Sequence, residues 1–321
     1  MNRKGFKIRP EMVPAILLVF GFIAGAMESK YFLDPKYLLD SSTQYVETGL
    51  LALAMTFVIV SGNIDLSVAS MTVLVACVTA KLMESGWATP SACAVAIGLG
   101  VILGAINGFL ISKAKLPSFV VTLATMAVYR GIAQVLLGPN SAKVNAGFAG
   151  LDTQYLPGHV PIPLVIFLVT ALILGVLLHR TLFGRWVFSI GTNETASFYS
   201  GIPAAKVKLG VFALSGLMAA AAALLMDSRL GVARFDHANG LELDAITAVL
   251  LGGASINGGR GSILGTVLAL FLVAVLRIGM GVANVKAEYQ LVVIGSLLVI
   301  AVLSGNFVER LSSARKPSAA K

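Results

Sequence analysis

The sequence predicts an all-α integral membrane protein, and three observations support this fold class. Of the 321 residues, 57% are hydrophobic and only 12% are charged, whereas a soluble domain has about 25% charged residues. The mean hydropathy is +0.89. The apolar residues also lie in long runs, without the alternation of polar and apolar residues that a transmembrane β-strand requires. Most of this chain is therefore expected to face lipid or its own interior.

Ten apolar stretches follow one another, and each is a candidate membrane helix because a bilayer core requires about 20 apolar residues per helix. Several are only 12 to 17 residues long, so we expect about ten transmembrane helices, with eight full spans and a broken pair as the alternative. The first stretch follows basic residues but no signal-peptidase site follows it, so it is interpreted as a retained helix. The stretches are 12–27, 46–61, 66–83, 91–112, 116–137, 161–179, 209–226, 244–256, 263–281 and 289–305.

The placement of Lys and Arg predicts the orientation, because cytoplasmic loops of membrane proteins are enriched in these residues. With the N-terminus inside, ten spans place fifteen of them on the cytoplasmic side and seven outside. We therefore expect a cytoplasmic tail over 1–11, a transmembrane domain over 12–305 and a cytoplasmic tail over 306–321. This topology accounts for the net charge of +9 with lipid as the partner and without nucleic acid.

Residues for metal, redox or covalent chemistry are sparse. Cys77 and Cys93 lie inside apolar stretches, and His159, His179 and His237 are scattered without the spacing of metal ligands. We expect no metal site, no catalytic residues and no enzymatic activity.

Two polar, glycine-rich interruptions divide apolar runs, at 61–70 and at 252–262. Each follows a short apolar run and precedes another, which indicates a weak internal repeat. Broken helices at membrane depth are tolerated where protein or a water-filled cavity surrounds them, and they are typical of transport pathways. The alternative interpretation is that each interruption is a tight turn between two helices at the cytoplasmic face. The candidate residues are Gly62, Asn63, Asp65, Ser67, Gly252, Gly253, Asn257, Gly258 and Gly259.

Charged residues inside or beside the apolar stretches allow two interpretations. Asp65 precedes an apolar helical run, so its carboxylate either caps that helix or faces a polar path. Asp244 is interpreted in the same way, as a helix-start residue. Arg130 and Arg277 lie within spans and are expected to snorkel outward, with a role in a polar path as a secondary reading.

The longest inner loop, at about 180–208, contains a second candidate site. Thr192 or Asn193 can cap a short helix over 194–200, which Gly201 and Pro203 would end. A helix this short needs a docking surface, because it is unstable alone in water. Phe198 and Tyr199 would dock it either in the groove of a partner or on the inner face of its own chain.

Several segments resemble the permease subunits of ribose-type bacterial ABC importers. The run Gly62-Asn-Ile-Asp-Leu-Ser-Val-Ala-Ser70 resembles their Gly-Gly-Ile-Asp-Leu-Ser-Val-Gly-Ser segment. The runs Asn107-Gly108, Leu116-Pro-Ser-Phe-Val-Val-Thr-Leu-Ala-Thr-Met126 and Arg130-Gly131 resemble the next one. Thr181-Leu-Phe-Gly-Arg-Trp186 and Gly191 to Ile202 are similar to the coupling loop, and 240–266 to the most distinctive block. The resemblance extends over about residues 45–305, and similar Tyr-Ser patterns occur in permeases for autoinducer-2 and rhamnose.

The resemblance implies a permease subunit in the bacterial inner membrane that passes a monosaccharide or related small polar carbohydrate. A cytoplasmic ATPase, a second permease (homodimer or heterodimer) and a periplasmic sugar-binding protein would be its partners. The chain itself contains no Gly-x-x-x-x-Gly-Lys-Ser/Thr phosphate loop, so ATP would be hydrolysed by another polypeptide and no cofactor is expected here. A stand-alone ion-coupled transporter of a small polar solute is the alternative. The implied ATPase-coupling residues are Gly191, Asn193, Glu194, Ala196, Phe198, Tyr199, Gly201 and Ile202.

This chain departs from the family pattern in both candidate sites. Asn63 and Ala69 stand where glycine is usual in the first break. Ser197, Phe198 and Tyr199 replace a common Ala-Arg-Leu in the coupling helix. We therefore expect an aromatic contact to the ATPase in place of a charged one.

Overall fold

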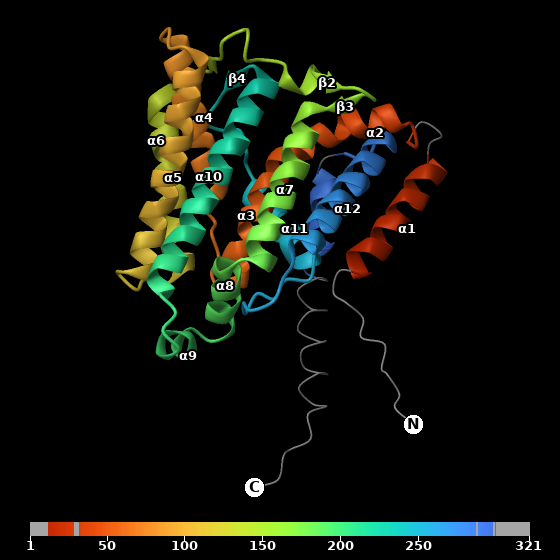
Figure 1. Cartoon of the computed structure of the whole chain (residues 1–321). Coiled ribbons are helices and arrows are strands. Elements are labelled where there is room, and N and C mark those ends of the chain that lie inside the picture. Colours follow the sequence, from red (N-terminus) through yellow and green to blue (C-terminus); the bar gives the residue numbers. More distant parts are fainter. Residues whose placement is uncertain (1–11, 29–31, 287, 298, 300–321) are drawn as a thin grey trace, which may run out of the picture.

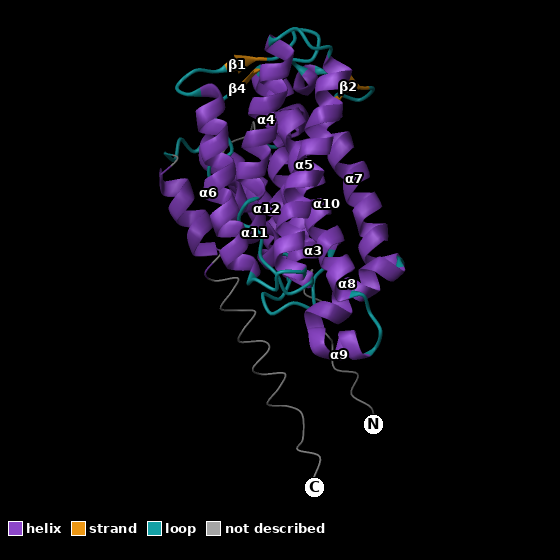
Figure 2. Cartoon of the chain, turned by 90° about the vertical axis from the view of Figure 1, so that its left-hand side faces the viewer, coloured by secondary structure: helices purple, strands orange, loops and turns teal. Residues whose placement is uncertain are grey.

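A computed structural model describes residues 12–28, 32–286, 288–297 and 299. The predicted tails at 1–11 and 306–321, and the end of the last apolar stretch, lie outside these residues. In the described part the chain is a helical bundle whose strands are only two residues long (Figures 1 and 2). The prediction of an all-α membrane protein is confirmed.

The long helices follow one another in the order of the apolar stretches, and further short helices and short strands lie between them. The helices are α1 (Met12–Glu28), α2 (Pro35–Ser42), the 3-10 turn η1 (Thr43–Tyr45), α3 (Val46–Val60), α4 (Val68–Glu84), α5 (Thr89–Ser112), α6 (Ser118–Leu137), the 3-10 turn η2 (Leu151–Thr153), α7 (Ile162–Arg180), α8 (Leu182–Thr192), α9 (Glu194–Tyr199), α10 (Ala204–Leu230), α11 (Leu241–Leu251) and α12 (Ile263–Val282). Residues 288–297 are also helical. Strand β1 (Ala142–Lys143) pairs with β4 (Val232–Ala233), and β2 (Tyr155–Leu156) pairs with β3 (Val160–Pro161), both antiparallel.

Six helical segments of the described chain are long and apolar enough to cross a membrane: Pro35–Val60, Thr89–Ser112, Ser118–Leu137, Ile162–Arg180, Ala204–Leu230 and Ile263–Val282. Helices α4 and α11 are shorter, with 17 and 11 residues. A multi-pass membrane protein follows from these spans, and the count of ten crossings stays a prediction.

The bundle has two distinct ends. The strands and α2 lie at one end, here named the strand end, and α8 and α9 lie at the other, here named the α9 end (Figures 1 and 2). Helix α3 occupies the centre: all fifteen of its residues are buried, as expected for a helix that is apolar all round. Helices α5, α6 and α7 instead leave large apolar side chains exposed, as helices in contact with lipid do.

Helices α5 and α10 approach closely through a row of glycines. Gly100, Gly104 and Gly108, spaced by four residues on α5, face Gly216 and its neighbours on α10. A Cβ atom on Gly104 would overlap the carbonyl oxygen of Phe212 and lie 2.9 Å from the nitrogen of Gly216. Small residues at this spacing allow two membrane helices to pack backbone against backbone.

Candidate functional site

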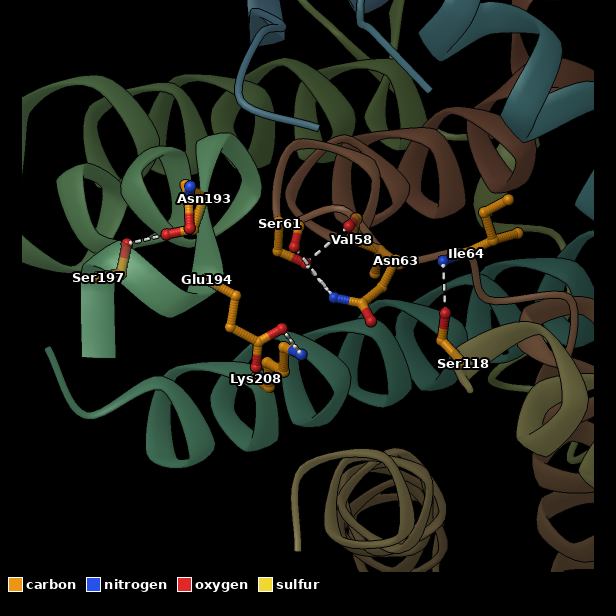
Figure 3. A network of polar contacts seen from close by, with 9 residues as sticks. All are labelled: Val58, Ser61, Asn63, Ile64, Ser118, Asn193, Glu194, Ser197 and Lys208. Atoms are coloured by element: carbon orange, nitrogen blue, oxygen red, sulfur yellow. Dashed lines mark hydrogen bonds and ion pairs between the residues drawn. The ribbon is translucent and has the colours of Figure 1, made fainter. Parts of the chain in front are cut away.

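The first helix break begins where α3 ends in a glycine turn. Gly62 has a φ of +78°, which favours glycine. Its N–H donates to the carbonyl of Ile59 at 2.9 Å, and the N–H of Asn63 donates to that of Val58 at 3.1 Å. The Asn63 amide also donates to the hydroxyl of Ser61 at 2.9 Å (Figure 3). The turn thus satisfies its exposed backbone groups inside the protein.

The second break repeats this turn at the end of α11. Gly253 has a φ of +89°. Its N–H donates to the carbonyl of Leu250 at 3.0 Å, and the N–H of Ala254 donates to that of Val249 at 3.2 Å. Gly253 and Ala254 therefore stand where Gly62 and Asn63 stand in the first break. The internal repeat read from composition is present in the backbone geometry.

The two breaks meet each other and the last turn of α8. The N–H of Gly259 donates to the carbonyl of Val60 at 2.8 Å. A Cβ on Gly258 would lie 2.8 Å from the Cα of Gly62, and a Cβ on Gly191 would overlap the Val60 oxygen and lie 2.6 Å from the Gly259 nitrogen. Three chain segments therefore touch mainly through their main chains, with the Thr192 hydroxyl also close to Gly259. We name Gly62, Gly191, Gly258 and Gly259 the glycine junction.

The other residues of the two breaks have different surroundings. Gly252 packs on Gly265 at the start of α12, where a Cβ would lie 2.6 Å from the Gly265 carbonyl carbon. Asn257 is exposed in the turn that precedes Gly258. Asn257 therefore lies beside the glycine junction without being part of it.

Asp65 lies in the protein interior, at the start of α4. Its carboxylate is fully buried and accepts hydrogen bonds from the backbone N–H of Ser67 at 3.0 Å, the Ser67 hydroxyl at 2.6 Å and the Ser215 hydroxyl of α10 at 2.8 Å. The Asn107 amide of α5 donates to the Ser67 hydroxyl at 2.8 Å, and the Tyr129 hydroxyl of α6 donates to Asn107 at 3.3 Å. We name these five residues the Asp65 network. It joins α4, α5, α6 and α10, and its carboxylate both binds a helix-start N–H and ties α4 to α10.

Asp65→Asn is expected to leave uptake within about twofold of wild type. The Asn carbonyl can accept the two hydrogen bonds from Ser67, and its amide can donate to the Ser215 hydroxyl, so every buried partner keeps a bond. Asp65→Leu leaves three buried donors unpaired, each at a cost of about 1–3 kcal/mol, and should reduce both membrane accumulation and uptake strongly. Uptake and yield of the two variants in the same vesicles check this. Complete loss of uptake by a well-accumulated Asp65→Asn chain would contradict it.

The short helix of the inner loop forms at the α9 end as helix α9. Asn193 caps it, accepting from the N–H of Ala196 at 2.9 Å, and Gly201 follows it with a φ of +81°. Ser197 is buried and its hydroxyl donates to the Asn193 carbonyl at 2.8 Å (Figure 3). Glu194 is bound to Lys208 of α10 at 2.7 Å. The loop is thus fixed to its own chain on one side.

The other side of α9 presents aromatic side chains. Phe198 is 67% exposed and Tyr199 is 83% exposed, and their rings pack edge to face. Ile202 is half-buried against the core. The segment is therefore held to its own chain through the Glu194–Lys208 ion pair and Ile202, while the aromatic tip of α9 stays uncovered. Phe198 and Tyr199 thus do not pack on the inner face of their own chain, and their docking in the groove of a partner stays a prediction.

Ion pairs hold the strand ends of the two broken helices. Arg229 of α10 donates to Glu47 in the first turn of α3 at 2.8 Å, and Arg277 of α12 donates to both carboxylate oxygens of Asp244 in α11 at 2.7 and 2.8 Å. Asp244 lies in the first turn of α11, as a helix-start residue does, but it does not cap the helix, because Gly240 occupies the N-cap position. The expectation that Arg277 snorkels outward is wrong, because a carboxylate within reach binds it more strongly than interfacial water.

A comparison with protein families distinguishes a permease subunit of an importer from a stand-alone ion-coupled transporter. A family model described as branched-chain amino acid transport system / permease component matches residues 37–302. The chain belongs to this family. It is 41% identical over 275 residues to the ribose import permease protein of Bacillus subtilis (strain 168), covering 85% of each chain. It is 38% identical over 303 residues to the autoinducer 2 import system permease protein of Escherichia coli (strain K12), covering 91% of each. No solved structure matches the chain.

Membership in this permease family supports one of the two transport readings. The match includes both breaks, the Asp65 network and α9. It agrees with a permease component of an import system and gives no support to a stand-alone ion-coupled transporter. The family consists of transport components rather than enzymes, in line with the expectation of no catalytic activity.

Sequence reasoning did not find all the residues of the site. Ser215 and Tyr129 gave no signal, because a serine or tyrosine in an apolar helix is common and their partners are far away in the chain. Gly191 was identified only as the start of the coupling segment, and its contact with both breaks was not foreseen. The Gly-x-x-x-Gly spacing of α5 was readable from the sequence and was missed.

Proposed function

We propose that this chain is the permease subunit of an ATP-driven importer and forms the membrane path for a monosaccharide or related small polar carbohydrate. The glycine junction is the observation that best supports this. It connects the last turn of α8, which leads into α9, with both broken helices by main-chain contact. A force applied at α9 would therefore reach α3 and α11 together.

The physical basis of this coupling is the close approach of main chain to main chain at Gly62, Gly191 and Gly258. Flexible side chains between two segments would absorb a displacement of an ångström by changing rotamer, whereas touching backbones must move together or separate. Displacement of α8 through Gly191 would shift the ends of α3 and α11. Such a shift would change the access of the path from one side of the membrane to the other. The chain makes and breaks no bond in the solute.

The proposal assigns a partner to each end of the bundle. A cytoplasmic ATPase that supplies the hydrolysis of ATP would bind the Phe198 and Tyr199 tip of α9, so the α9 end would be cytoplasmic. A periplasmic sugar-binding protein would deliver the solute at the strand end. A second permease subunit, identical or homologous, would complete the path. The protein would lie in a bacterial inner membrane with both termini in the cytoplasm, as its Lys and Arg distribution favours.

The relatives support a class of solute rather than one compound. The two import permeases described above are named for ribose and for autoinducer 2. The identities of 41% and 38% are too similar to favour the solute of one relative over that of the other for this chain. We therefore propose small carbohydrates and related polyols as the class to screen.

Phe198→Asp is expected to reduce recovery of the ATPase with the tagged chain at least tenfold. An exposed aromatic side chain is a typical anchor in a partner's groove, and a buried unpaired carboxylate there costs several kcal/mol. Phe198→Leu, which keeps an apolar side chain of similar size, should recover at least half as much ATPase as wild type. Equal recovery with Phe198→Asp and wild type would place the ATPase contact elsewhere.

A pull-down of the tagged chain from gently solubilised native membranes, followed by mass spectrometry, tests the function itself. The expected result is co-recovery of an ATPase with a phosphate loop, and capture of a periplasmic sugar-binding protein whose ligand then identifies the solute. Recovery of the chain alone, with uptake in vesicles driven by an ion gradient and not by ATP, would overturn the proposal.

A further inference from the structure

Arg130 of α6 differs from the other arginines inside the long helices. Arg229 and Arg277 are each bound to a carboxylate, of Glu47 and Asp244. Arg130, by contrast, lies within 4.0 Å of no carboxylate among the residues that the structure describes. Its Nε donates to the hydroxyl of Ser70 in α4 at 3.3 Å. A cation in a membrane helix that is not neutralised by its own chain is a candidate functional residue.

The position of Ser70 along α4 places the guanidinium inside the membrane core. Ser70 is the third residue of α4, which begins at Val68, and Glu84 at the strand end lies fourteen positions further along the helix. At a rise of 1.5 Å per residue, Ser70 lies about 21 Å below that end of α4. In a hydrocarbon core about 30 Å thick, Ser70 then lies inside the core, about 9 Å from its boundary at the α9 end. The expectation that Arg130 snorkels outward is not supported, because its Nε is directed at the buried Ser70 hydroxyl on α4.

The surroundings of Arg130 leave part of its guanidinium uncovered. Its neighbours Tyr129 and Ala133 are buried against α4 and α5, while Arg130 is half-buried at the edge of this face. A Cβ on Gly131 would meet no atom within 4 Å. Gln134, one turn along on the same side of α6, is exposed. An arginine and an amide thus face a space that this chain does not fill.

Hydrocarbon is an unfavourable occupant of that space. Arginine has five N–H donors, and a polar group without a partner in an apolar medium costs several kcal/mol. Water or a polar solute satisfies these donors, and the Gln134 amide adds two donors and an acceptor. Hydroxyl oxygens accept from such groups with good geometry. The polar edge of α6 is therefore suited to a hydrated path for a hydroxyl-bearing solute.

We propose that Arg130 and Gln134 line the solute path within the membrane core and bind oxygen atoms of the passing carbohydrate. This inference rests on the proposed function and adds to it the part of the chain that contacts the solute. A second permease subunit covers this edge of α6 and encloses the path between the two chains. Arg130 holds the solute by several hydrogen bonds, and Ser70 holds the guanidinium in place.

Accessibility to water distinguishes this path from a lipid-facing or subunit-packed edge. Single cysteines replace Arg130, Gln134 or Val135 in a parent chain with Cys77→Ala and Cys93→Ser, assembled with its importer partners in native vesicles. Val135 is the matched control because it is 89% exposed, apolar and next to Gln134. A membrane-impermeant methanethiosulfonate, which requires hydrated thiolate, should label Arg130→Cys and Gln134→Cys at least tenfold faster than Val135→Cys. Solute-loaded binding protein with ATP should slow that labelling.

Uptake provides the second measurement and separates the two proposals. Arg130→Met should reduce ATP-driven uptake at least tenfold at normal complex recovery, whereas Val135→Met should stay within twofold of the parent. Equally slow labelling at all three positions, or normal uptake by Arg130→Met, would overturn the path proposal. If Arg130→Cys does not accumulate in the membrane, the labelling rate of Gln134→Cys is compared with that of Val135→Cys, and equal rates would overturn the path proposal. Absence of ATP-driven uptake in the parent itself would instead overturn the proposed importer function.

Discussion

Gly191→Val is expected to reduce uptake at least twentyfold while the chain stays in the membrane and bound to its ATPase. The valine Cβ would overlap the Val60 carbonyl oxygen and lie 2.6 Å from the Gly259 nitrogen, and neither is a side chain that can turn away. The last turn of α8 must then separate from both helix breaks. Basal ATP hydrolysis by the assembled complex should persist, so the variant hydrolyses ATP without moving solute. Uptake and ATP hydrolysis in the same proteoliposomes measure this.

Gly281→Val is the matched control for that result. Gly281 also lies in the last turn of a helix, α12, but a Cβ there would meet no atom within 4 Å. It should transport within about twofold of wild type. Normal uptake by Gly191→Val would show that the contact between α8 and the breaks can separate without consequence, and it would remove the main support for coupling through the glycine junction.

The ends of the broken helices could be predicted from the sequence, but the contact between the two breaks could not. Glycine and polar residues between apolar runs predict where α3 and α11 end, because the glycine turn is determined by local backbone conformation. The hydrogen bond between Gly259 and Val60 joins residues about two hundred positions apart. No local pattern specifies that pairing, which depends on how α3, α8 and α11 pack.

For the charged residues in the spans, too, the sequence indicates the position but not the contact partner. Asp65, Arg130 and Arg277 are each conspicuous in an apolar sequence, so their importance was predictable. Their roles were not, because each depends on a partner from another helix: Ser215, Ser70 and Asp244. Arg130 and Arg277 were interpreted identically from the sequence. The structure separates them, since only Arg277 has a carboxylate opposite it.

The two broken helices are held differently at their two ends. At the strand end each is joined to a neighbouring helix by an ion pair, Glu47 to Arg229 and Asp244 to Arg277. At the α9 end they are joined to each other and to α8 by the glycine junction. Ion pairs keep a fixed partner while allowing small rotations, whereas backbone contact transmits displacement. This arrangement is consistent with motion that starts at the α9 end and pivots near the strand end.

Gly104→Val is expected to prevent stable folding of the bundle. Its Cβ would overlap the carbonyl oxygen of Phe212 and its branches would meet Gly216, so α5 and α10 must move apart along their whole contact. Overpacking in a close-packed interior typically costs about 1–3 kcal/mol and more where backbone opposes backbone. The cost adds to lost packing of the Asp65 network, to which both helices contribute. Membrane yield and thermal aggregation of the detergent-solubilised chain should both show the loss.

Gly98→Val in the same helix separates interface packing from helix propensity. Both glycines lie inside α5, and both variants exchange glycine for a β-branched residue, so the change in intrinsic helix stability is the same. A Cβ on Gly98 would meet no atom within 4 Å. Gly98→Val should therefore accumulate and resist heat like wild type. If both variants fail equally, the effect belongs to α5 alone; if both fold equally, α5 and α10 do not require the close approach that Gly100, Gly104 and Gly108 provide.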